Sequence, residues 1–116
     1  MKVLDERDFE YRHADHGPKY LMKGPRSNFG LIRLLGMEKV PGHVHRVMEE
    51  TFFVLEGRIR VTVGEETVTA TEGQLVYIEP GEVHAVENPD ETPVKLVVTA
   101  APFCDGDKYS PDGVKL

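Results

Sequence analysis

PGHVHRVMEETFFVLEG, residues 41–57, and GEVHAVEN, residues 81–88, together hold three of the five histidines of the chain. In an extended strand, successive side chains point to opposite faces, so His43 and His45 point the same way. Their two imidazoles can then hold one metal ion between them. These two segments therefore contain a candidate metal site.

Two further strands can bring a carboxylate and a third imidazole to the same place. Residues 50–55 form an apolar run headed by Glu50, and a shorter apolar run surrounds His84. Glu50 shares a strand face with Phe52, whereas Glu49 lies on the opposite face. If these strands close into a barrel, four side chains meet inside it: His43, His45, Glu50 and His84.

The remaining pattern is that of short strands separated by turns. Residues 58–63 alternate polar and apolar side chains, which predicts a half-buried strand with three side chains inside: Ile59, Val61 and Val63. Residues 29–40 are too short and too rich in glycine for a stable helix, and predict one or two strands. Further strands are expected at 67–70, 75–78 and 93–99. Glycine and proline recur roughly every ten residues, which indicates an all-β sandwich or barrel.

The length of 116 residues predicts one domain. We expect an irregular N-terminal arm with room for a short strand over residues 1–28, a barrel over 29–100, and a turn-rich tail over 101–116 that lies on the barrel or on a partner. His13 and His16 fall in the arm, where a following glycine and proline end any helix that would align them. We interpret both as solvated histidines.

Charge and composition exclude several classes of function. The net charge of −6 and the pI near 5.3 argue against a nucleic-acid partner, which would require clustered Lys and Arg. The start of the chain is charged where a signal peptide would be apolar, and no later segment is apolar enough to span a bilayer. We therefore expect no membrane association and a cytoplasmic location. A single cysteine, Cys104, fits a reducing compartment.

The sequence resembles the cupin superfamily, and within it the small single-domain cupins of the type-2 conserved barrel. The first motif of that superfamily is G-x5-H-x-H-x3,4-E-x6-G, and its body is matched here by His43, His45, Glu50 and Gly57. The second motif is G-x5-P-x-G-x2-H-x3-N, and most of it is matched by Gly73, Gly81, His84 and Asn88. The resemblance implies an all-β fold, a single jelly-roll β-barrel.

Two positions depart from these motifs. The opening glycine of the first motif falls at Met37, while Gly36 lies one residue earlier. The proline of the second motif falls at Glu79, while Pro80 lies beside it. Both departures concern turns or strand entry, so they leave the ligand positions intact.

The resemblance implies that one divalent metal ion is bound by His43, His45, Glu50 and His84. Three imidazoles and a carboxylate suit Mn, Fe, Co, Ni, Cu or Zn, and they leave coordination positions open if the ion is octahedral. The sequence is compatible with each of these metals.

Three functions are compatible with such a centre and a small-molecule substrate. The first is a dioxygenase-like oxidoreductase, the second a metal-dependent sugar or sugar-phosphate isomerase or epimerase, and the third a non-enzymatic cupin that binds a sugar or other small molecule. An oxygenase needs an open metal in a largely apolar cavity. The sequence offers side chains to line it, and this favours the oxidative class: Phe29, Met48, Phe52, Val54, Tyr77 and Val86.

Three other side chains each have a functional and a structural interpretation. Arg33 either meets an anionic substrate inside the barrel or extends outward at an edge. Tyr77 either supplies an acid or base as a catalytic residue or is a buried structural tyrosine. Cys104 is either a reactive thiol near the barrel mouth or a buried inert one.

A partner copy is expected as well. The hydrophobic share of 40% is somewhat low for a chain of this length, so a second copy would bury useful surface. The open edge strands and the apolar run at residues 29–35 predict a homodimer formed by pairing of barrels.

Overall fold

The computed structural model describes residues 1–116 and contains nine strands and one short 3-10 helix. No helix has the length and the apolar character needed to cross a membrane. The helix η1 covers Glu6–Asp8, and the strands are β1 Gly17–Lys23, β2 Asn28–Leu34, β3 Lys39–His43, β4 Glu49–Glu56, β5 Arg58–Val63, β6 Glu66–Thr71, β7 Leu75–Ile78, β8 His84–Glu87 and β9 Val94–Ala101. The predicted all-β class is confirmed.

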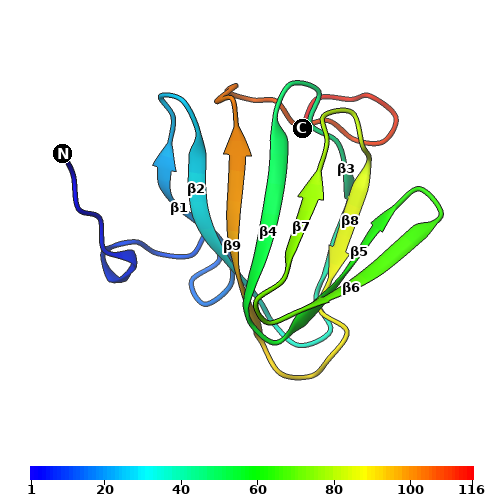
Figure 1. The fold of residues 1–116 in the computed structure, drawn as a ribbon, viewed down its shortest axis with the longest axis horizontal. Helices are drawn as coiled ribbons and strands as arrows, with labels where there is room; N and C mark the ends of the chain where they lie inside the picture. The colour runs from blue at the N-terminus through cyan, green and yellow to red at the C-terminus, as the bar shows by residue number, and fades with distance from the viewer.

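The strands form two sheets that face each other as the walls of a jelly roll (Figure 1). The larger sheet has the order β1-β2-β9-β4-β7, and the smaller has the order β3-β8-β5-β6. Every pairing is antiparallel, and three pairings contain a bulge or another register shift. The chain therefore crosses repeatedly between the two walls, which places residues from distant segments inside the same space.

The core lies between the sheets and follows the period of two that strands impose. In β9, every second residue from Val94 to Ala100 is buried, and its neighbours are half-buried. In β5, Ile59 and Val61 are buried as predicted, while Val63 is half-buried. Removing such a side chain from water contributes about 1.5–3 kcal/mol. Burial of one face of each strand thus fixes which side chains point toward the interior.

Both ends of the chain add to the sheets. β1, which lies in the expected N-terminal arm, pairs with β2 and forms one edge of the larger sheet. Its Lys19 is buried, and the ammonium bonds the carbonyl of Glu6 at 3.0 Å and lies 3.2 Å from the Glu6 carboxylate, which holds the start of the chain against the sheet. In the tail, Tyr109 forms a β-bridge with Val44. This part of the tail lies against the barrel.

Candidate metal centre

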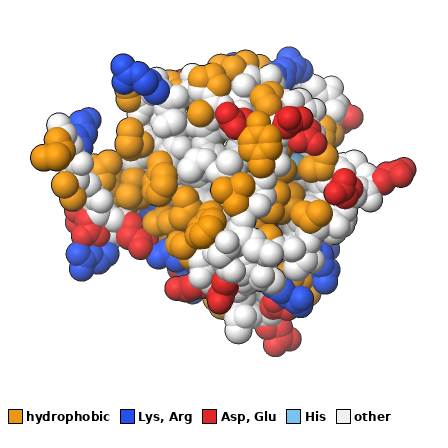
Figure 2. Space-filling view, in the orientation of Figure 1, with side chains coloured by type: hydrophobic (Ala, Val, Ile, Leu, Met, Phe, Trp, Pro, Cys, Tyr) orange, Lys and Arg blue, Asp and Glu red, His pale blue; other side chains and the backbone are white.

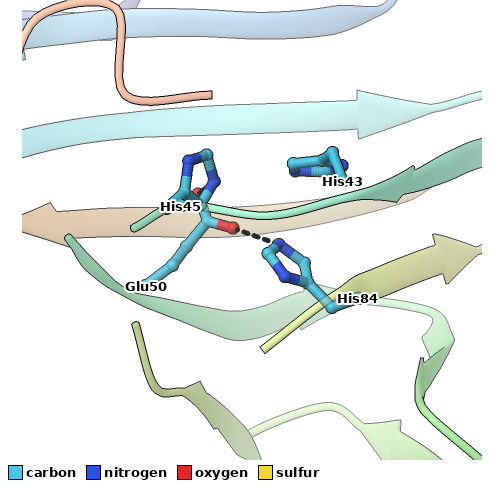
Figure 3. Close-up of side chains that lie close together, drawn as sticks. All are labelled: His43, His45, Glu50 and His84. Atoms are coloured by element: carbon cyan, nitrogen blue, oxygen red, sulfur yellow. Dashed lines mark hydrogen bonds and ion pairs between the residues drawn. The ribbon is translucent and has the colours of Figure 1, made fainter. Parts of the chain in front are cut away.

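The four predicted ligands converge between the two sheets (Figure 3). His43 ends β3, His84 begins β8, and His45 follows β3 by two residues. Glu50 comes from β4 in the opposite sheet, so the centre joins the two walls. All four side chains are buried, and one candidate ligand atom from each lies within 4.8 Å of the other three. Convergence from three strands is what the strand pattern predicted.

Each imidazole is held in one orientation by a backbone carbonyl. The three Nδ1–carbonyl distances are 3.0 Å for His43 to Pro41, 2.6 Å for His45 to Asp107 and 2.9 Å for His84 to Glu82. A carbonyl oxygen only accepts, so each Nδ1 carries a proton and donates it. In a neutral imidazole the Nε2 lone pair is then free to bind a metal, which is the arrangement common to metal-binding histidines.

The contacts inside the cluster need a positive charge. Glu50 places its carboxylate oxygens 3.0 Å from Nε2 of His84 and 3.4 Å from Nε2 of His45. The His45 Nε2 is buried and has no hydrogen-bond partner. A carboxylate oxygen and an unprotonated Nε2 both present lone pairs, so they attract each other only through a proton or a metal ion. The donor set therefore fits a transition metal ion, with a shared proton in its place when the metal is absent.

Burial and charge shift the pKa values of the cluster in the metal-free protein. Burial lowers the pKa of His43 to about 4, which keeps this imidazole neutral. For Glu50, burial favours the acid form, but the hydrogen bond with His84 and the close contact with His45 outweigh it and lower the pKa to about 2. Burial likewise disfavours charge on His45, yet the nearby carboxylate of Glu50 raises its pKa. An anionic Glu50 beside neutral His43 is a state ready to accept a cation.

A cavity of about 390 Å³ opens beside the cluster and has room for a small organic molecule. His43, His45 and Glu50 lie in its wall. Four apolar side chains line the interior next to them: Met48, Phe52, Val86 and Leu96. Three of these, Met48, Phe52 and Val86, are pocket residues that the sequence predicted.

The other predicted pocket residues lie elsewhere. Val54 is fully buried in the core and does not line the cavity. Phe29 and Arg33 occupy the outward positions of β2, whose inward positions are Asn28, Gly30, Ile32 and Leu34. Phe29 is 40% exposed, and the Arg33 guanidinium donates to the carbonyl of Asp15 at 2.7 Å. The pocket assignments of these three residues are wrong, and the outward interpretation of Arg33 is the one observed.

Tyr77 is also outside the cavity. It lies on the outer face of β7 and is 48% exposed, so neither the catalytic nor the buried structural interpretation describes it. Its neighbour in sequence, Ile78, occupies the inward position. Cys104, which belongs to the tail, is half-buried and lies in the cavity wall.

Sequence reasoning missed the tyrosine that does line the cavity. Tyr20 lies on β1, in the segment expected to be irregular. A register shift between Tyr20 and Met22 breaks the alternation of inward and outward side chains that would have indicated a strand. Four cations in the cavity wall were missed as well: Arg12, Lys23, Lys39 and Lys108.

Similarity to known proteins identifies the family of this chain. The profile of the cupin domain family matches residues 30–100, which contain all four residues of the cluster. The chain belongs to the cupin family. The resemblance inferred from the two motifs is thereby confirmed, and the match begins at β2 and ends within β9.

Relatives of this cupin differ in their size and in what is known of them. Mannose-1-phosphate guanylyltransferase RfbM of Salmonella typhimurium is 35% identical over 88 residues, which make up 76% of the cupin and 17% of RfbM. The uncharacterized protein SCO3923 of Streptomyces coelicolor is 37% identical over 99 residues, covering 85% of the cupin and 93% of the relative. The crystal structure of TT1209 from Thermus thermophilus has a TM-score of 0.75 at 27% identity, and the match covers 88% of the cupin and 98% of TT1209. The cupin thus spans a small part of RfbM and nearly all of the other two.

Proposed function

We propose that this cupin binds one divalent transition metal ion through His43, His45, Glu50 and His84 and acts on a small organic substrate in the adjoining cavity. The observation that carries the proposal is the orientation of the imidazoles. All three are held at Nδ1 by carbonyls, and the Nε2 atoms of His45 and His84 meet one carboxylate. A structural core would leave neither a buried, unbonded Nε2 nor a buried carboxylate there.

The chain's own residues prepare the centre for chemistry. The carbonyl contacts fix the histidine rings, which removes the need to reorder them when a ligand arrives. Glu50 supplies one negative charge, so a bound divalent cation keeps a net positive charge. The bound ion would supply Lewis acidity or redox chemistry at positions open to the cavity. Met48, Phe52 and Val86 give the cavity wall an apolar surface beside the centre.

We infer dioxygenase-like oxidoreductase chemistry as the reaction class. It is supported by the position of the cluster beside an apolar wall, since an oxygenase requires an open metal in a largely dry cavity. The cavity volume of about 390 Å³ suits a substrate of modest size. Mn, Fe and Cu are the metals compatible with this class.

A second candidate is a metal-dependent isomerase or epimerase that acts on a sugar phosphate. Two observations favour it. RfbM, whose name refers to mannose 1-phosphate, is 35% identical to this cupin over most of the cupin's length. In addition, the cavity wall holds cations that could meet a phosphate: Arg12, Lys23 and Lys108.

Metal analysis separates these proposals. The protein is purified without added metal and analysed by elemental mass spectrometry, followed by oxygen-uptake assays on a panel of small organic acids and isomerisation assays on sugar phosphates. Bound Fe, Cu or Mn with oxygen uptake supports the oxidoreductase. Bound Zn or Ni with sugar-phosphate turnover supports the isomerase, and stoichiometric metal with no turnover leaves the cupin as a binding protein.

The ligand set is tested with a pair of histidine variants. His84→Ala should lose metal, whereas His16→Ala should keep full metal content because His16 lies outside the cluster. Circular dichroism verifies that both variants keep the strand content of the wild type. Full metal content in a folded His84→Ala variant would contradict the proposed centre.

A further inference from the structure

Tyr20 is the one tyrosine in the cavity wall. It pairs with Gly30 across β1 and β2, and Gly30 occupies an inward position of the larger sheet. Side chains of paired residues lie on the same face of a sheet, so the phenol ring points into the barrel. Its neighbours in the wall on the same strands are Pro18 and Ile32.

The position of the Tyr20 ring depends on the absence of a side chain at residue 30. A Cβ built on Gly30 would lie 2.8 Å from Cδ1 of Tyr20 and 2.8 Å from the carbonyl oxygen of Lys19. Any larger residue would therefore displace the ring. The register shift that follows Tyr20 adds a local bend to β1, which sets the direction of the side chain. The position of the Tyr20 ring therefore depends on the glycine at residue 30.

The electrostatic surroundings of the Tyr20 hydroxyl connect it to the metal centre. Burial raises the pKa of Tyr20, and the negative charge of Glu50 raises it further. The positive charge of Arg12 acts in the opposite direction. The Tyr20 hydroxyl therefore stays protonated and can donate a hydrogen bond.

Two other cations complete the surroundings. The Lys23 ammonium lies 5.8 Å from the centroid of the Tyr20 ring. Lys108 lies in the cavity wall, and its charge is one of the influences that lower the pKa of His43, after burial and together with the charge of His84. None of Arg12, Lys23 and Lys108 forms an ion pair with a carboxylate.

Three of the four acidic groups of the wall are engaged by other residues, and the fourth, Asp105, is exposed. Asp107 accepts hydrogen bonds from the backbone N–H groups of Arg46, Val47 and Met48. Glu38 accepts from the backbone N–H of Leu35, Glu50 belongs to the cluster, and Asp105 is exposed. In a chain with a net charge of −6, three cations without carboxylate partners around one cavity form a place for an anion.

We infer that Tyr20, Arg12, Lys23 and Lys108 form the binding site for a carboxylate or phosphate group of the substrate, with the Tyr20 hydroxyl donating a hydrogen bond to it. This inference rests on the proposed function, since it supplies the substrate class for the same cavity. It assigns to Tyr20 the substrate contact that the sequence suggested for Tyr77. It also predicts that neutral analogues of the substrate bind weakly.

Calorimetric titration of the metal-loaded protein tests the inference with three probes: acetate, inorganic phosphate and neutral glycerol. Tyr20→Phe keeps the ring on Gly30 and removes only the hydroxyl, and Lys108→Gln changes an exposed residue. Each should weaken binding of the preferred anion about tenfold, the loss expected for one charge-assisted hydrogen bond. Tyr77→Phe and Arg60→Gln, which lie on outer faces, are the matched controls and should bind as the wild type does.

The outcomes are distinguishable from a failure of the metal proposal. Wild-type affinity in both cavity variants, or equal binding of glycerol, would overturn the inference even if metal is bound normally. Tighter binding of acetate than of phosphate assigns the carboxylate class, and the reverse assigns phosphate. If the protein takes up no metal, the same titrations on metal-free protein, followed by amide shifts of Tyr20 and Lys108 in nitrogen-15 spectra, decide whether the anion site exists.

Discussion

Glu50 is the single carboxylate in the cluster, and its neighbour Glu49 offers a direct control. Glu50 points inward and is buried, whereas Glu49 is exposed on the opposite face of β4. We expect Glu50→Gln to weaken Zn²⁺ binding by about a hundredfold, because it removes the only negative ligand. Competition with a chromophoric chelator measures the affinity. Glu49→Gln should match the wild type, and an equal loss in both variants would contradict the assignment.

Asp107 is a buried carboxylate outside the ligand set. Its oxygens accept three backbone N–H groups, and its carbonyl orients His45. Burial alone would raise the pKa of Asp107, but the hydrogen bonds from Met48, Arg46 and Val47 lower it. The unfolded chain therefore binds a proton here at higher pH than the folded protein does. The stability that ionised Asp107 contributes is lost as the pH falls from about 3.9 through the lowered pKa.

This linkage gives a test by urea unfolding of the metal-free protein. At neutral pH, Asp107→Asn should lower the free energy of unfolding by about 1–3 kcal/mol, because an ionised acceptor of three N–H groups is removed. The difference from the wild type should shrink as the pH falls through the lowered pKa of Asp107. Asp112→Asn, in the exposed end of the tail, serves as the control. A difference that does not change with pH would show that the charge of Asp107 is unimportant.

At the scale of elements, the turn before β3 has an unusual residue. Met37 adopts a φ of 62°, in the left-handed region, and is 58% exposed. It occupies the position where the first cupin motif has its opening glycine, so the departure seen in the sequence is a strained backbone in the structure. Gly36 is needed for a different reason: its backbone is not left-handed, but a Cβ there would overlap the backbone of Glu91.

Met37→Gly should therefore stabilise the protein. Removing the strain of a non-glycine residue in the left-handed region should raise the free energy of unfolding by about 1–2 kcal/mol. The extra freedom of glycine in the unfolded chain offsets about half of that gain. We expect a net increase of about 0.5–1 kcal/mol in the free energy of unfolding. Chemical denaturation measures it, with Met22→Gly in β1 as a control that should destabilise. A decrease for Met37→Gly would contradict the strain argument.

The sequence predicted best the elements that have a regular period. The alternation in residues 58–63 and the spacing of His43, His45, Glu50 and His84 predicted the strands and the cluster correctly. A short strand was expected somewhere in residues 1–28, but the bounds of β1 could not be predicted because its register shift interrupts the alternation. The contact of His45 with Asp107 joins residues 62 positions apart, and no local pattern indicates such a contact. The sequence suggested Tyr77 for the cavity, and only the sheet register shows that Tyr77 faces outward and Tyr20 inward.

At the scale of the whole molecule, the larger sheet leaves apolar side chains uncovered. Figure 2, in the orientation of Figure 1, shows hydrophobic side chains gathered on the surface of the molecule where this sheet lies. The exposed large hydrophobic residues on its strands are Met22, Phe29, Leu55, Leu75 and Tyr77. An exposed apolar surface of this kind is typical of an interface, and an antiparallel edge adds backbone groups for pairing.

We expect a homodimer in solution with this face buried. Analytical ultracentrifugation should give about twice the chain mass of 13.0 kDa. Leu75→Glu should shift the protein toward the monomer because it places a charge in the interface. Val68→Glu on β6, an exposed apolar residue of the other sheet, should leave the dimer intact. A wild-type protein that sediments as a monomer at micromolar concentration would contradict this prediction.

The origin of the ligands in both walls of the barrel has a kinetic consequence. An ion held by β3 and β8 on one side and by β4 on the other would cross-link the two sheets. Its release would require ligands on both sheets to let go, so exchange with free metal should be slow and should quicken with mild denaturant. A metal ion bound in this way would stay with its chain even where free metal is scarce.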